Sequence, residues 1–96
     1  VIGDLTLEYG SRKVIRDGKE VDLTKTEYDL LELLMRNANL VLTRERIYEA
    51  IWDYDFETNS KSLDVYIGYL RRKVDNNPET RLIHTIRGVG YCLREP

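Results

Sequence analysis

The chain has 96 residues, of which 42% are hydrophobic and 33% are charged, and its formal net charge is −2. This length predicts one domain that buries roughly 60–65% of its unfolded surface without metal or disulfide staples. No apolar run approaches the ~20 residues of a membrane span, and no signal peptide opens the chain. The single cysteine, Cys92, excludes an internal disulfide and fits a reducing cytoplasm. We therefore expect a cytoplasmic domain with no membrane partner.

The charges are unevenly distributed. Residues 1–59 contain 8 Lys and Arg against 13 Asp and Glu, whereas residues 60–96 contain 7 against 4. The last third of the chain is thus cationic and the rest is acidic. Because phosphate binding needs only a local positive field, the negative total does not exclude nucleic acid as a ligand.

Residues 1–23 have the pattern of short antiparallel strands. Apolar and polar residues alternate around Leu5, and Asp17-Gly18 is a strong hairpin signal between the stretches 12–16 and 19–23. We predict a small sheet with one packed face and one face in water.

A helix is predicted next, over residues 24–37. Thr24 and Glu27 have the spacing of a capping box, in which each side chain satisfies a free amide of the first turn. The apolar residues that follow form the broad face of a core helix.

A short strand at 40–43 is predicted to lead into a second helix, residues 44–51, with Thr43 as its cap. In the polar connection 53–59, acidic residues alternate as at the start of a calcium loop. Thr58 occupies the position where such a loop requires glycine, so a solvated acidic loop that docks a protein is the better interpretation.

The central helix, residues 60–75, has two dissimilar faces. Apolar residues at helical spacing form the first: Leu63, Ile67, Leu70 and Val74. The opposite face has no acid on its centre line and carries Lys61, Val65, Gly68 and Arg72, flanked by Ser62 and Tyr69. A narrow basic face with a few apolar atoms suits a DNA major groove. A plain surface helix of mixed composition is the alternative.

Asn76-Asn77-Pro78 ends the central helix. The stretches 82–86 and 91–94 then flank Arg87-Gly88-Val89-Gly90, which predicts a hairpin whose two glycines allow a tight turn and whose Arg87 projects freely. The predicted class is α+β: a winged helix-turn-helix with an N-terminal antiparallel sheet, three helices and a C-terminal β-hairpin wing.

The sequence contains no nucleophile elbow, P-loop, catalytic carboxylate pair or zinc spacing. His84 has no second imidazole or cysteine at ligand spacing, so it is expected to be an ordinary strand residue. Cys92 is expected to be a small buried apolar side chain. We predict no metal, no cofactor and no enzymatic activity.

Four stretches resemble the DNA-binding effector domain of OmpR/PhoB-type response regulators: TKTEYDLLELL (24–34), TRERIYEAIW (43–52), SLDVYIGYLRRKV (62–74) and HTIRGVGY (84–91). The resemblance covers nearly the whole chain, and its RGVGY segment is quite specific. Such domains follow a phosphorylatable receiver domain and a linker. The resemblance therefore implies that residues 1–96 are one effector domain, a fragment of a longer protein that lacks its receiver.

The resemblance also implies roles for individual residues. The positions that match DNA-phosphate contacts are Arg44, Trp52, Lys61, Ser62, Tyr66, Arg71 and Tyr91. Spacing adds Arg72, which points to the centre of the groove face. The positions that match base contacts are Asp64, Val65 and Tyr69 in the major groove, and Arg87 with neighbouring Thr85 in the minor groove. Residues Asp53, Tyr54, Asp55, Phe56 and Glu57 match the segment that family activators present to RNA polymerase.

Elementary chemistry makes these roles plausible. Cations neutralise phosphates, a valine such as Val65 packs on a thymine methyl, and a carboxylate such as Asp64 accepts from cytosine N4. Arg87 on a narrow hairpin suits an A·T-rich minor groove. Two plainer interpretations stay open: Asp64 favours the positive end of its own helix, and Tyr66 belongs mostly to the core.

The chain departs from several family members at Gly68, where they carry Arg or another cation, and from some at Tyr69, where they carry Arg. Its groove face is smaller and less basic, so no relative's base preference is carried over. Glycine costs about 1 kcal/mol of helix propensity. We expect Gly68 to permit a close approach of the helix to DNA.

The partners that the resemblance implies are double-stranded DNA, bound as direct repeats by two head-to-tail copies, RNA polymerase, the receiver domain and a cognate sensor kinase. The alternative is a winged helix used as a protein-docking module, with Val65 and Tyr69 as anchors and the loop 53–59 as its rim. Arg44 and Arg87 discriminate between the two, because DNA binding needs both charges and weakens with salt.

Overall fold

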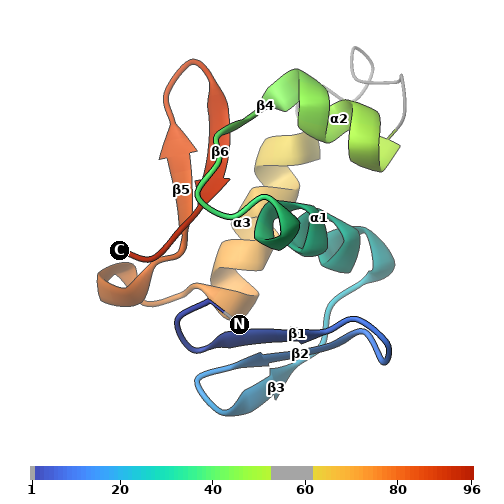
Figure 1. The fold of residues 1–96 in the computed structure, drawn as a ribbon, viewed down its shortest axis with the longest axis vertical. Helices are drawn as coiled ribbons and strands as arrows, with labels where there is room; N and C mark the ends of the chain where they lie inside the picture. Colours follow the sequence, from blue (N-terminus) through green and yellow to red (C-terminus); the bar gives the residue numbers. More distant parts are fainter. Residues whose placement is uncertain (1, 53–61) are drawn as a thin grey trace.

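The structure is a computed structural model that describes residues 2–52 and 62–96. Two three-stranded antiparallel sheets flank three α-helices, one sheet below them and one at their side (Figure 1). The elements in chain order are β1 (Leu5–Glu8), β2 (Lys13–Arg16), β3 (Lys19–Val21), α1 (Lys25–Arg36), β4 (Leu42–Thr43), α2 (Arg44–Trp52), α3 (Ser62–Val74), a 3-10 turn (Pro78–Thr80), β5 (Ile83–Ile86) and β6 (Gly90–Leu93). This confirms the predicted winged helix-turn-helix architecture.

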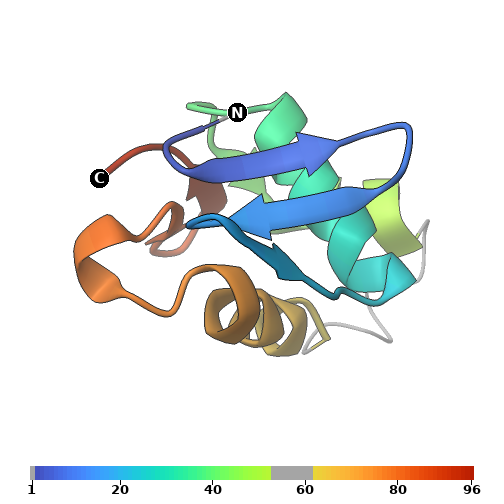
Figure 2. The same cartoon turned by 90° about the horizontal axis from the view of Figure 1, so that it is seen from below.

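The N-terminal sheet has the order β1-β2-β3 and lies along α1 and beside α3 (Figure 2). Asp17 and Gly18, with φ of 55° and 74°, make the β2–β3 turn. Positive φ at both central residues is what the tightest hairpin turns require. The Asp17-Gly18 hairpin is therefore confirmed.

Helix α1 begins at the predicted capping box. The Glu27 amide donates to the Thr24 hydroxyl at 3.3 Å, and the Thr24 amide donates to the Glu27 carboxylate at 3.0 Å. The helix buries an apolar face made of Tyr28, Leu30, Leu31, Leu34 and Met35. Both ends of the prediction hold, since Asn37 is the C-terminal cap.

The same Glu27 side chain is only 3% exposed. Lys73 of α3 donates to its Oε1 at 2.7 Å. Burial would raise the pKa of Glu27, but the bonds from Lys73 and Thr24 outweigh it and hold the pKa below its ordinary value. The capping box thus also ties α1 to the end of α3.

A lowered pKa in the folded state makes stability depend on pH. The contribution of Glu27 is fully present above its unfolded pKa of about 4.3 and is lost as the pH falls through the lower folded value. We expect a Glu27→Gln variant to be less stable than the wild type at pH 7 and to show a smaller loss between pH 5 and pH 3. Urea unfolding at several pH values measures this, and parallel curves for the two proteins would contradict it.

The strand predicted at 40–43 is shorter than expected, because only Leu42 and Thr43 pair, with Tyr91 and Gly90 of β6. Asn39 has a φ of 70°, and Leu40 donates back to the Asn37 carbonyl in a turn. The prediction at residues 40 and 41 was wrong, because Leu40 belongs to this turn and the strand begins only at Leu42.

The second sheet has the order β4-β6-β5, and β5 and β6 form the wing. Strand β5 begins at Ile83, one residue later than predicted, and the Leu82 amide donates to the carboxylate of Asp75 at 2.8 Å. Gly88, with a φ of 72°, lies in the turn as expected. Gly90 does not: it is the first residue of β6, and a Cβ there would lie 1.9 Å from the Leu42 carbonyl oxygen. Its reason is close approach of β4, so its assignment to the turn was wrong.

Helix α2 is capped as predicted, since the Arg46 amide donates to the Thr43 hydroxyl at 3.2 Å. It extends one residue further than expected, through Trp52. Helix α3 runs through the middle of the molecule (Figure 1) and buries its predicted apolar face, Leu63, Ile67, Leu70 and Val74. The buried Tyr48 hydroxyl accepts from the Leu63 amide at 3.0 Å, which joins α2 to the start of α3.

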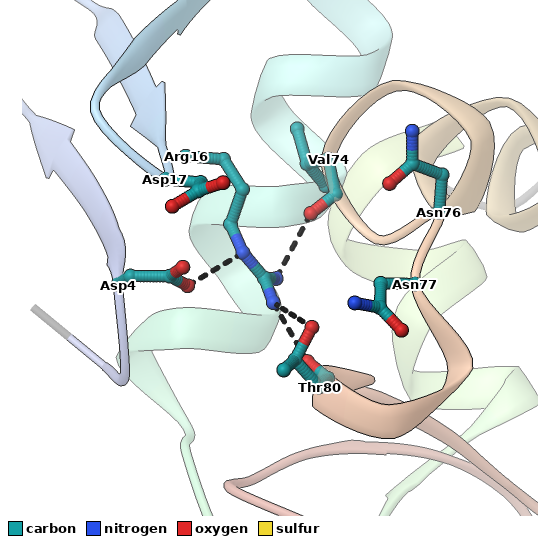
Figure 3. Close-up of a pocket in the computed structure, with 7 residues that line it drawn as sticks. All are labelled: Asp4, Arg16, Asp17, Val74, Asn76, Asn77 and Thr80. Atoms are coloured by element: carbon teal, nitrogen blue, oxygen red, sulfur yellow. Dashed lines mark hydrogen bonds and ion pairs between the residues drawn. The ribbon is translucent and has the colours of Figure 1, made fainter.

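A polar junction holds the end of α3 against the N-terminal sheet (Figure 3). Arg16 of β2 donates to the Val74 carbonyl at 2.9 Å and pairs with Asp4 at 2.6 Å and with the buried Asp75 at 3.2 Å. It also donates to the Thr80 carbonyl at 2.6 Å. One guanidinium therefore connects β2, the last turn of α3 and the 3-10 turn, and it fixes the direction of α3.

Within residues 2–52 and 62–96, no helix has the length and apolar character needed to cross a bilayer. The same residues contain no group of three or more potential metal-binding side chains. Cys92 is buried, and the His84 ring contacts the Arg94 carbonyl oxygen at 3.1 Å. Cys92 is thus a small buried side chain and His84 is an ordinary strand residue, as the sequence predicted.

Candidate nucleic-acid interface

The start of α2, the start of α3 and the tip of the wing meet at the end of the molecule opposite the N-terminal sheet (Figure 1). A shallow hollow lies between them. Five of the predicted site residues line it, namely Arg44, Asp64, Thr85, Arg87 and Tyr91, together with the wing backbone from Ile86 to Gly90. The fold thus brings together residues that are up to 47 positions apart in the sequence.

Asp64 is the centre of this arrangement. Its Oδ1 accepts from the guanidinium of Arg44 at 2.6 Å and also from the hydroxyl of the largely buried Tyr91. Bonds from Arg44 and then Tyr91 lower the pKa of Asp64, while burial and the bond to Asp64 raise the pKa of Tyr91 to about 12. At neutral pH the pair is therefore a carboxylate and a neutral phenol, and it holds α2, α3 and β6 together at the mouth of the hollow.

Arg71 joins the last turn of α3 to the wing. Its Nη2 donates to the Ile83 carbonyl at 3.1 Å and to the Thr85 hydroxyl at 2.7 Å. Its guanidinium also lies 5.9 Å from the centre of the Tyr91 ring. Burial lowers the pKa of Arg71, although an arginine remains charged at neutral pH. Arg71 therefore sets the position of the wing relative to α3 while it keeps a positive charge beneath the hollow.

A row of rings supports α3 from the side of α2. The ring centres of Tyr48 and Trp52 are 5.2 Å apart, those of Trp52 and Tyr66 are 5.5 Å apart, and those of Tyr66 and Tyr69 are 5.7 Å apart. The guanidinium of Arg72 lies 5.3 Å from the Tyr69 ring centre. Trp52 and Tyr66, both half-buried, thus pack between the two helices, which agrees with the plainer interpretation that Tyr66 belongs partly to the core.

The outward face of α3 carries Val65, Gly68, Tyr69 and Arg72, as predicted. Val65 is 47% exposed and Tyr69 is 38% exposed. Arg72 and, on the wing tip, Arg87 are exposed as well. This surface combines two cations with two apolar side chains and lies beside the hollow.

Several predicted residues lie outside the part that the structure describes. These are Lys61, the side chain of Ser62 and the loop residues Asp53, Tyr54, Asp55, Phe56 and Glu57. Their assignments remain predictions.

Sequence reasoning missed the connection between Asp64, Arg44 and Tyr91. It treated the three as separate DNA contacts, although two of them bond to the third across 20 and 27 positions. No local spacing signals such a contact. Gly88 and Val89, which also line the hollow, were predicted as part of the hairpin turn but not as site residues. The sequence feature that could have identified them as site residues is their position next to Arg87.

The capped helix α2, the amphipathic helix α3 and the β-hairpin wing define a winged helix-turn-helix domain of the type that places a helix against DNA. The family model described as "Transcriptional regulatory protein, C terminal" matches residues 18–93. The chain belongs to this family, whose members are the OmpR/PhoB-type DNA-binding domains. That family is a class of transcription regulators and not a class of enzymes.

Curated relatives agree with this membership. The response regulator MprA of Mycobacterium sp. (strain KMS) is 55% identical over 92 residues, which cover 96% of this chain and 40% of the relative. MprA of Mycobacterium tuberculosis (strain ATCC 25177 / H37Ra) is 54% identical over the same length. The chain thus spans about 40% of the length of the curated relatives that it matches.

Solved structures show the same fold. A protein described as belonging to a family of streptococcal redox sensors that evolved from two-component response regulators has a TM-score of 0.88 at 40% identity, with 100% of this chain and 42% of that chain covered. The Klebsiella pneumoniae RstA DNA-binding domain, solved in complex with the RstA box, has a TM-score of 0.86 at 27% identity. That match covers 98% of this chain and 94% of the RstA chain.

Proposed function

We propose that this domain binds double-stranded DNA sequence-specifically as the output domain of a two-component response regulator. Helix α3 enters the major groove, α2 braces it, and the wing, residues 82–94, touches the adjacent minor groove. The observation that carries the proposal is the meeting of Arg44, Asp64 and Arg87, from α2, α3 and the wing, around one hollow. A long, two-groove contact needs this combination of a helix and a cationic hairpin.

Each cation has a distinct task in this proposal. Arg44 opens α2 and reaches a phosphate, while Asp64 keeps its guanidinium in place. Arg72 contacts the backbone along the groove, and Arg87 enters the minor groove, where the negative potential of A·T-rich DNA is deepest. Arg71 and Tyr91, whose polar groups already bond within the domain, contribute mainly by positioning the wing and Asp64.

The partners in the full-length protein belong to the same proposal. They are a preceding receiver domain, its cognate sensor kinase and RNA polymerase, which the segment 53–57 contacts, all in the cytoplasm. Two copies bind a direct repeat head to tail. Support comes from the response-regulator relatives and from the RstA domain, which was solved with its own DNA box.

Salt dependence and Arg87 test the proposal. A contact set of about six phosphates gives a slope of log affinity against log salt near −5. We expect Arg87→Ala to weaken binding about tenfold and to make the slope shallower by roughly one. Fluorescence anisotropy of a labelled duplex, titrated at four salt concentrations, measures both quantities.

Arg94→Ala is the matched control. Arg94 is an exposed arginine directly after β6 (Gly90–Leu93), at the end of the hairpin away from its turn, and it does not line the hollow, so its loss removes the same charge elsewhere. Its affinity and slope should equal those of the wild type. Equal losses for the two variants would show that only total charge matters and would contradict a contact by the wing tip.

A second candidate function rests on the exposure of Val65 and Tyr69. A winged helix that docks a protein through these two anchors, with the loop 53–59 as its rim, would bind independently of Arg44 and Arg87. A flat salt dependence, together with no loss for Arg87→Ala, would favour this module over DNA binding.

A further inference from the structure

The exposed face of α3 contains an apolar strip made of Val65, Gly68 and Tyr69. Val65 and Tyr69 are among the most exposed large hydrophobic residues of the described chain, and they lie one helical turn apart on the side away from the core. Gly68 adjoins them. An apolar strip within a cationic surface needs a physical reason, because exposed apolar area on the DNA side gains nothing from phosphates.

The packing of residues 2–52 and 62–96 does not explain Gly68. A Cβ at this position would meet no atom of the described residues within 4 Å, and Gly68 is not among the glycines with positive φ. In a helix interior, glycine is the least favourable residue after proline. Among the described residues, neither a steric contact nor the backbone conformation requires glycine at position 68. The missing side chain leaves open space on the helix surface, which points to a ligand that approaches the helix closely.

Tyr69 is braced before any ligand arrives. Its ring meets the edge of Tyr66, which packs on Trp52, and the Arg72 guanidinium lies over it. Burial of an exposed aromatic usually costs the entropy of ordering its side chain, and such bracing reduces that cost. The Tyr69 ring thus has a fixed position beside the exposed isopropyl group of Val65, and Gly68 leaves the helix surface open on the other side of Val65.

We propose that the apolar strip reads the C5-methyl groups of thymines in the major groove and so makes the operator thymine-containing at the positions under α3. This inference rests on the proposed DNA binding. Thymine is the one base that offers a methyl group in this groove. Four residues of helix rise about 6 Å, against about 3.4 Å per base pair, so Val65 and Tyr69 reach methyl groups about two base-pair steps apart. Gly68 lets the helix come close enough for both contacts.

Replacement of thymine by deoxyuridine tests the inference without changing any hydrogen-bonding group. In the duplex that the domain selects, each thymine is replaced singly by deoxyuridine, and affinity is measured by anisotropy at constant salt. We expect about three- to fourfold weaker binding at each of two positions, and no change elsewhere.

Variants of the strip assign each methyl group. Val65→Ala should abolish the thymine preference at one position and Tyr69→Ala at the other, because a lost partner leaves the methyl group without a contact. Matched controls are Val41→Ala and Tyr9→Ala, which change equally exposed residues away from α3; Tyr9 even carries an arginine over its ring. Both controls should keep the full preference.

Gly68→Ala tests the close approach. We expect this variant to have a higher melting temperature than the wild type, and that measurement serves as the control for folding. We also expect it to bind the selected duplex at least fivefold more weakly. An unchanged affinity would overturn the role of Gly68.

The outcomes separate the inference from the proposed function. Equal affinity for thymine and deoxyuridine at every position, with site-specific binding intact, overturns the inference alone. Unchanged affinity and unchanged thymine preference of Tyr69→Ala also overturn it. No site-specific binding by the wild type refutes the proposed function itself.

Discussion

A Gly90→Ala variant is expected to lose about 3 kcal/mol or more of unfolding free energy. The new Cβ would lie 1.9 Å from the carbonyl oxygen of Leu42 and 2.9 Å from its carbonyl carbon. Both are backbone atoms, so no side-chain rotation relieves the clash. The pairing between β4 and β6 must open, and this displaces β4, the strand that leads directly into α2. Urea unfolding followed by circular dichroism measures the loss.

Gly10→Ala is the control for this variant. At Gly10 a Cβ would meet no atom of the described chain within 4 Å, and its φ is not positive. The change should alter stability by no more than about 0.5 kcal/mol. If Gly90→Ala and Gly10→Ala were equally stable, β4 and β6 would not be in close contact at Gly90.

An Asp75→Ala variant is expected to lose about 3–5 kcal/mol, because it leaves a largely buried guanidinium without its buried partner. The Asp75 side chain is fully buried. It accepts from the amides of Leu82 and Ile83 at 2.8 and 3.0 Å and pairs with Arg16 at 3.2 Å (Figure 3 shows the surroundings of Arg16). Its loss strands two buried amides as well as the charge. Equilibrium unfolding in urea checks the size of the effect.

Two comparisons separate the buried pair from ordinary charge effects. Asp75→Asn keeps the size of the side chain and one oxygen acceptor, so it should lose less stability than Asp75→Ala. Glu20→Ala removes an exposed partner of Lys13, 4.0 Å away, and should cost no more than about 1 kcal/mol. A loss for Asp75→Ala as small as that for Glu20→Ala would show that the junction between α3 and the N-terminal sheet is not held by this pair.

Features with a short-range cause could be predicted from the sequence. The capping box links residues three apart, the Asp17-Gly18 turn is set by its own two φ values, and the apolar face of α3 follows from helical spacing. These elements fix the order of strands and helices, and that order already defines a winged helix.

Features with a long-range cause could not be predicted. Arg16 and Asp75 are 59 positions apart, and Asp64 and Tyr91 are 27 apart. Only the folded chain shows that Asp64 is held by Arg44 and Tyr91. Gly90 illustrates the same limit: in the sequence it resembles a turn glycine, whereas its cause is the backbone of Leu42, 48 positions earlier. The sequence already showed the exposed apolar residues beside Gly68. It did not show that Trp52 of α2 supports Tyr69 through Tyr66.

Selection from a random duplex library tests the central claim most directly. The domain is immobilised, bound duplexes are amplified through several rounds, and the enriched pool is sequenced. DNA recognition by α3 and the wing predicts one enriched motif, arranged as a direct repeat with an A·T-rich segment beside each half-site, that an Arg44→Ala, Arg87→Ala double variant fails to enrich. A pool that stays random with the wild type, or a motif that the double variant enriches equally well, would contradict it.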